Sequence, residues 1–157
     1  MNGPLPLESG SFHAAMSLDV VLHVRDRRAL FREMTRVLAP GGRFLFTDAG
    51  VVVGVVSNDE VVSRSLHGYT QFVAPGFNER ALEDAGFRLL EIEDRTDSLL
   101  ANATGRLASR LGHRDELEQV ESPAGFESQM RYLDTVIALA RRRSVSRMMY
   151  LAESHGG

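Results

Sequence analysis

Residues 36–48 read RVLAPGGRFLFTD, and the prediction of the fold depends on this run. Asp26 can cap a helix that leads into it, because apolar residues recur after Asp26 at helical spacing. Those residues are Leu30, Phe31, Met34, Val37 and Leu38. The segment Ala39–Gly42 ends the helix, since proline and glycine are poor helix residues and favour a turn. Arg43–Thr47 then reads as a buried strand that ends at Asp48.

The same alternation continues on both sides of this run. Strands are predicted at Phe12–Met16, Phe87–Glu93 and Val145–Leu151, and the apolar stretch Phe12–Met16 suits a buried strand. Helices are predicted after the capping box of Ser57 and Glu60, at Asn78–Ala85, after a cap at Asp97, and along the apolar stripe from Phe126 to Ala140. The run Val51–Val56 fits a strand or a buried loop. Strands that alternate with helices predict an α/β fold with a largely parallel sheet and helices on both faces.

Composition bounds the kind of protein. With 157 residues, 43% of them hydrophobic, residues 1–157 are expected to form a single domain. The chain has no cysteine, which excludes disulfides, thiolate metal sites and a cysteine nucleophile. All 18 basic residues are arginines, so no lysine is present to form a Schiff base or to bind phosphates in a P-loop. The five histidines show no paired spacing, and we expect no metal site.

Charge and hydropathy restrict the partners. The formal net charge is -3, so no basic field favours nucleic acid or an anionic membrane. The apolar runs are too short to span a bilayer, and the first residues do not form a signal peptide. The absence of cysteine fits a cytoplasmic location.

Acidic residues follow three of the predicted strands. They are Asp19, Asp48 and Asp94. In parallel α/β sheets, ligands bind at the carboxyl ends of the strands. These three positions are the first candidates for a functional site.

Several segments together resemble a known family. LPLESGSF at 5–12, LHVRD at 22–26, the run at 36–48 and AGF at 85–87 follow one another as in class I (Rossmann-like) S-adenosylmethionine-dependent methyltransferases that act on small molecules. The resemblance is greatest to the phosphoethanolamine and sarcosine types, and it covers only the C-terminal portion of the family's domain. It implies a Rossmann-like methyltransferase sheet, incomplete because its first three strands are lacking.

The resemblance also implies site residues. Asp48 matches an aspartate that ends the family's fifth strand, and it is expected to contact the methyl acceptor, an amine or an oxygen. His67 and Tyr69 match a segment over the acceptor, although the family has an arginine where this chain has His67, which argues against a phosphate-bearing acceptor. Leu18 and Asp19 fall where the family contacts the cofactor, S-adenosylmethionine. His23 is placed with them, and a histidine that only packs in the core is its alternative.

The family's cofactor cradle is not found in the sequence. No Gly-x-Gly-x-Gly turn occurs in the chain, so weak or absent cofactor binding is expected for these 157 residues alone. An open sheet edge would also favour a homodimer or a complementing partner chain. The alternative function is therefore a non-catalytic remnant or interaction module. A hydrolase is the least favoured alternative, because the chain has no Gly-x-Ser-x-Gly nucleophile elbow.

Overall fold

The computed structural model describes residues 5–155. In chain order its elements are β1 (Phe12–Leu18), the 3-10 turn η1 (Val21–His23), α1 (Arg27–Val37), β2 (Leu38–Val52), α2 (Asn58–Arg64), α3 (Phe77–Asp84), β3 (Phe87–Asp94), α4 (Thr96–Gly112), α5 (Arg114–Glu121), α6 (Pro123–Arg141) and β4 (Val145–Ser154). Each predicted strand is found, and so is each predicted helix. The mixed α/β class is confirmed.

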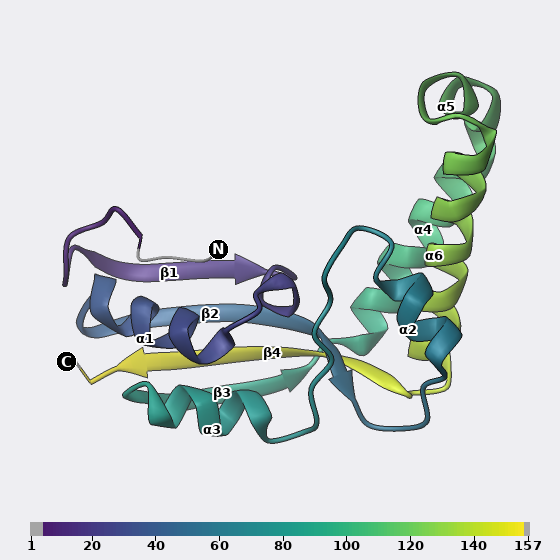
Figure 1. Ribbon diagram of the computed structural model, residues 1–157. Helices are drawn as coiled ribbons and strands as arrows, with labels where there is room; N and C mark the ends of the chain where they lie inside the picture. Colours follow the sequence, from purple (N-terminus) through teal and green to yellow (C-terminus); the bar gives the residue numbers. More distant parts are fainter. Residues whose placement is uncertain (1–4, 156–157) are drawn as a thin grey trace.

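The four strands form one sheet in the order β1-β2-β4-β3. β1 and β2 are parallel, whereas β4 is antiparallel to both of its neighbours. The expectation of a largely parallel sheet is wrong in this respect. The reason is that α4 and α6 form a hairpin that brings the chain back to the end of the sheet where β3 stopped, so β4 must run in the opposite direction (Figure 1). The carboxyl ends of β1, β2 and β3 nevertheless meet at one edge.

The main core lies between one face of the sheet and the helices α1 and α3. Its aromatic residues are Phe31, Phe44, Phe46, Phe87 and Tyr150. The Phe46 and Tyr150 rings stack with centroids 4.7 Å apart and an angle of 14° between the planes. Both α1 and α3 pack on this face, so the predicted helix cover on two faces is observed on one side only of the described sheet.

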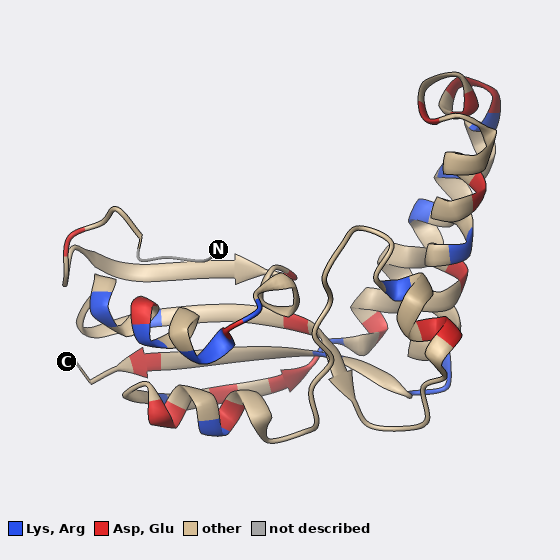
Figure 2. Cartoon of the chain, in the orientation of Figure 1, with Lys and Arg blue, Asp and Glu red and all other residues tan. Residues whose placement is uncertain are grey.

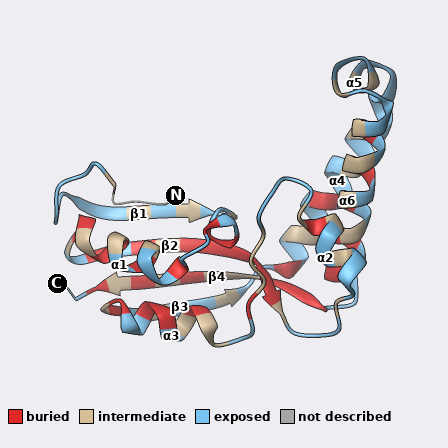
Figure 3. Ribbon diagram, viewed as in Figure 1, coloured by how far each residue is buried: buried red, intermediate tan, exposed pale blue. Residues whose placement is uncertain are grey.

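β1 is exposed, although the sequence predicted a buried strand. Met16 is 70% exposed and Leu18 is 50% exposed, and Figure 3 shows β1 largely pale blue beside the buried β2. The physical reason is its position: β1 is an edge strand, and the described residues place no strand on its outer side. β1 also carries no charged side chain, as the uniform tan of this strand in Figure 2 shows. The exposed edge is therefore apolar.

The ends of several elements follow local signals. Asp26 caps α1 by accepting a hydrogen bond from the Ala29 N–H. Ser57 and Glu60 form the predicted capping box of α2. β2 begins directly after α1 and continues to Val52, so the ambiguous run is a strand up to that residue and a loop beyond it. α4 begins one residue before Asp97, which therefore lies in the first turn of the helix and is not its cap.

The helices α4, α5 and α6 form a hairpin that projects from the carboxyl end of the sheet (Figure 1). Its own small core contains Ala103, Leu133, Val136 and Ile137. α2 packs against α6 at the base of this hairpin. None of the helices within residues 5–155 combines the length and the hydrophobicity needed to cross a membrane.

Candidate functional site

A cleft of about 140 Å³ lies between the carboxyl end of β1 and the base of the helical hairpin. Its polar lining residues are Asp19, His23, Arg64, Asn102, Arg106 and Tyr132. Its apolar wall comes from η1, β2, α4 and α6. Two of the predicted site residues, Asp19 and His23, come together in this cleft at the carboxyl end of β1.

Asp19 is held in one orientation at the mouth of the cleft. Its backbone has φ 52, in the left-handed region that aspartate tolerates better than most residues. The Thr47 hydroxyl accepts a hydrogen bond from the Asp19 N–H at 2.9 Å and donates one to Asp19 Oδ1 at 2.8 Å. The Arg147 guanidinium lies 2.9 Å from Oδ2. The carboxylate is therefore fixed, and its charge is already compensated.

The hydrogen bond of His23 defines which ring nitrogen is free. Nδ1 lies 2.9 Å from the main-chain carbonyl oxygen of Tyr69. A carbonyl oxygen can only accept, so Nδ1 must carry the proton in this contact. In the neutral imidazole, Nε2 then has a lone pair. His23 lines the cleft and can accept a proton from a bound molecule.

Asp48 does not line this cleft. Its side chain is fully buried and forms an ion pair with the equally buried Arg27 at 2.5 Å. Asp48 also accepts hydrogen bonds from Asn78 Nδ2 at 2.8 Å and from the Gly50 N–H at 2.9 Å. Arg27 donates in addition to the carbonyl oxygen of Gln71. This closed cluster joins β2 to α1 and α3.

His67 and Tyr69 lie on the loop that follows α2, and both are exposed. The His67 ring makes an edge contact with the Tyr132 ring, with centroids 5.0 Å apart. Tyr69 contributes its carbonyl oxygen to His23, while its ring packs under the Arg25 guanidinium. Each of the two therefore contacts a residue that lines the cleft, His23 or Tyr132, but does not line the cleft itself.

Sequence reasoning missed a buried arginine in the cleft. Arg64, the last residue of α2, is 5% exposed. Its Nη1 donates to the Tyr132 hydroxyl at 2.9 Å and its Nη2 donates to the Ala49 carbonyl at 2.9 Å. Arg64 and Tyr132 lie 68 positions apart in sequence, and no local pattern pairs them.

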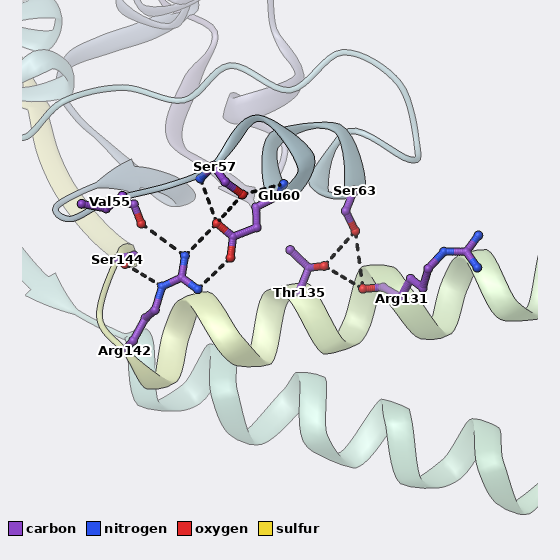
Figure 4. A network of polar contacts seen from close by, with 8 residues as sticks. All are labelled: Val55, Ser57, Glu60, Ser63, Arg131, Thr135, Arg142 and Ser144. Carbon is purple, nitrogen blue, oxygen red and sulfur yellow. Dashed lines mark hydrogen bonds and ion pairs between the residues drawn. The ribbon is translucent and has the colours of Figure 1, made fainter.

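A polar network fixes α2, and with it Arg64, against α6 (Figure 4). Arg142, just after α6, binds both carboxylate oxygens of Glu60 at 2.7 and 2.8 Å. Glu60 also accepts a hydrogen bond from the Ser57 N–H at 2.9 Å. One turn further along α2, the Ser63 and Thr135 hydroxyls lie 2.8 Å apart. The position of Arg64 therefore depends on contacts one turn before it.

This network predicts a specific acid sensitivity. Hydrogen bonds from Arg142 and Ser57 lower the pKa of Glu60 from 4.5 to about 2. A lowered pKa in the folded state means that Glu60 stabilises the fold above pH 4.5, and that this contribution is lost as the pH falls toward 2. We expect Glu60→Gln to lose less stability than the wild type between these two pH values, as measured by thermal unfolding midpoints.

The matched control is Glu118→Gln, which removes a glutamate from an ion pair with Arg114 on α5. This variant should keep the wild-type difference between the two pH values. If Glu60→Gln and the wild type lose equal stability on acidification, the link between Glu60 and the docking of α2 is wrong.

The strand order, the antiparallel β4 and the helices packed on the sheet define a Rossmann-like α/β fold. Comparison with solved structures gives the same class. The fold superposes on a phosphoethanolamine N-methyltransferase of Haemonchus contortus with a TM-score of 0.81 and 20% identity, over 96% of this chain and 35% of that one. A cyclopropane synthase of Mycobacterium tuberculosis gives a TM-score of 0.82 at 16% identity, over 98% of this chain and 57% of that one.

Sequence comparison is more specific. Residues 2–46 match the family described as "Methyltransferase domain". The chain is 30% identical over 134 residues to a sarcosine/dimethylglycine N-methyltransferase of Aphanothece halophytica, covering 83% of this chain and 44% of that protein. It is 36% identical over 90 residues to phosphoethanolamine N-methyltransferase 1 of Triticum aestivum, covering 57% of this chain and 18% of that protein.

The chain thus carries the fold and part of the sequence of the class I, Rossmann-like S-adenosylmethionine-dependent methyltransferases. The two relatives described above are, by their names, N-methyltransferases of small molecules. The chain spans less than half the length of these curated relatives.

Proposed function

We propose that residues 1–157 are the C-terminal part of a catalytic domain that transfers a methyl group from S-adenosylmethionine to a small amine. The observation that carries the proposal is the cleft at the carboxyl end of β1, where Asp19 and His23 lie together. The named relatives support it, because they methylate amines according to their names. A cytoplasmic location is part of the proposal, since a chain without cysteine suits a reducing compartment.

The residues at the end of β1 fit one side of the cofactor. Leu18 offers an exposed apolar side chain there, and Asp19 follows it in a fixed conformation. Together with His23, they would hold the adenine or the methionine part of S-adenosylmethionine. When bound, this cofactor supplies an electrophilic methyl group on a positively charged sulfur.

The acceptor side of the reaction requires positioning and removal of a proton. Methyl transfer is an in-line displacement, so the acceptor nitrogen must be held in line and must have a free lone pair. An ammonium acceptor has to lose a proton first. His23 Nε2 can take that proton, because the Tyr69 carbonyl fixes the other ring nitrogen as the donor.

The second candidate function is a non-catalytic interaction module, and no observation favours it over methyl transfer. The exposed apolar edge of β1 would suit it, but a strand donated by a longer methyltransferase domain would cover the same edge. We include pairing at this edge, with a second copy or a complementing chain, in the proposal.

S-adenosylhomocysteine, the product form of the cofactor, provides the test. In ¹H–¹⁵N spectra of the chain, we expect it to shift the signals of Leu18, Asp19 and His23. Affinity should be weaker than about 1 mM, because the glycine-rich cradle is not in this sequence. Leu18→Glu should abolish these shifts. The control is Val120→Glu on α5, where the side chain is 85% exposed. In Figure 1, α5 lies at the far end of the helical hairpin from β1.

Shifts confined to other elements, or none at β1 up to the solubility of the ligand, would contradict the proposed function. Micromolar binding by calorimetry would contradict the expected loss of affinity, and it would show that these residues alone make a complete cofactor site.

A further inference from the structure

Two arginines in this protein are almost completely buried, and only one of them has a carboxylate partner. Arg27 is 1% exposed and pairs with Asp48. Arg64 is 5% exposed, yet within residues 5–155 no carboxylate oxygen lies within 4.0 Å of its guanidinium. Its two hydrogen bonds go to neutral oxygens, those of Tyr132 and Ala49. A buried charge without an opposite charge is unfavourable, so this arrangement indicates a site that is completed by an anion.

The geometry directs Arg64 toward the cleft. Arg64 and Tyr132 both line it, and the two known hydrogen bonds use two of the five N–H groups of a guanidinium. Asp19, which is the carboxylate of the cleft, is already compensated by Arg147. The exposed Arg106 adds a second positive charge at the cleft wall. The net charge offered to a bound molecule near α2 and α6 is therefore positive.

We propose that Arg64 is the anion-binding residue of the cleft, and that the acceptor is a small amine which also carries a carboxylate. This inference rests on the proposed function and specifies the class of acceptor. One buried guanidinium matches the single charge of a carboxylate, and a fork of N–H groups fits its two oxygens. Tyr132 positions the guanidinium from one side, and the Glu60–Arg142 pair holds the helix that carries it.

The first test compares ligands on the unmodified chain. Sarcosine carries a carboxylate, whereas sarcosinamide has the same amine and a neutral amide of similar shape. In ¹H–¹⁵N titrations that follow Arg64 and Tyr132, we expect sarcosine to bind about 10–100-fold more tightly, the range of a charge-assisted hydrogen bond. Equal affinities would overturn the inference. Tighter binding of phosphoethanolamine than of sarcosine would overturn the choice of a carboxylate.

The second test uses matched variants. Arg64→Gln should reduce the affinity for sarcosine to that for sarcosinamide. Arg131→Gln is the control, since Arg131 is an exposed arginine on α6 next to Tyr132 and does not line the cleft. It should retain the wild-type preference for sarcosine over sarcosinamide. An equal loss of affinity in both variants would mean that sarcosine responds to the overall positive charge of this region and not to Arg64 itself.

If Arg64→Gln does not fold, the ligand comparison still decides the inference. A failure of this inference can also be distinguished from a failure of the proposed function. Failure of the anion preference with intact S-adenosylhomocysteine shifts at Leu18 and Asp19 would remove the role of Arg64 alone.

Discussion

Asp48→Ala is expected to lower the free energy of unfolding by about 3–5 kcal/mol, because it leaves the buried Arg27 guanidinium without its counter-charge. Arg27 would retain hydrogen bonds to the Asn78 and Gln71 oxygens, which are neutral. Removing one member of a buried pair costs more than the pair itself contributes, since the remaining charge cannot reach water. Chemical denaturation followed by circular dichroism measures the change.

A neighbouring pair provides the control. Arg28 and Asp84 also join α1 to α3, but their side chains are 47% and 62% exposed. Asp84→Ala should therefore cost less than about 1 kcal/mol. If the two alanine variants are equally stable, Asp48 is not the buried anchor described above, and its assignment to the acceptor would need to be reconsidered.

Phe46→Ala is the second change expected to have a large effect. Phe46 is 0% exposed, stacks on Tyr150, and lies 5.1 and 5.2 Å from the Phe44 and Phe31 ring centroids. Truncation of a fully buried phenylalanine leaves a cavity and typically costs about 3–5 kcal/mol. The same denaturation experiment measures it.

Phe12→Ala is the matched control, because Phe12 is 41% exposed on the edge strand β1. Phe12→Ala should lower the free energy of unfolding by about 1 kcal/mol, which is the range over which residues differ in strand propensity. A cost for Phe46→Ala as small as this would mean that the aromatic stack does not form the core. The result matters for the site, since the next residue, Thr47, holds Asp19.

The parts of the fold that local signals determine could be predicted. The Asp26 cap, the Ser57–Glu60 capping box and the strand at Phe87 follow from nearby residues, and the structure confirms them. The antiparallel direction of β4 and the exposure of β1 could not be predicted. Both depend on which strands lie side by side, and the hydrophobicity of a single strand does not encode that.

The candidate site was predictable only in its location. The rule that ligands bind at the carboxyl ends of parallel strands pointed to Asp19, which lines the cleft. It also gave Asp48, whose pairing with Arg27 depends on a side-chain contact that no sequence pattern displays. Arg64 was missed because its importance comes from burial beside Tyr132 on a distant helix, and a lone arginine at a helix end usually reads as solvated.

We propose that a methyl donor and an amine acceptor meet in the cleft at the end of β1. Chemical-shift mapping of S-adenosylhomocysteine and sarcosine on the same sample tests it most directly. Both ligands are expected to shift the signals of Asp19 and His23. S-adenosylhomocysteine should also shift Leu18, and sarcosine should also shift Arg64. Two sets of shifted residues that share no member would contradict it.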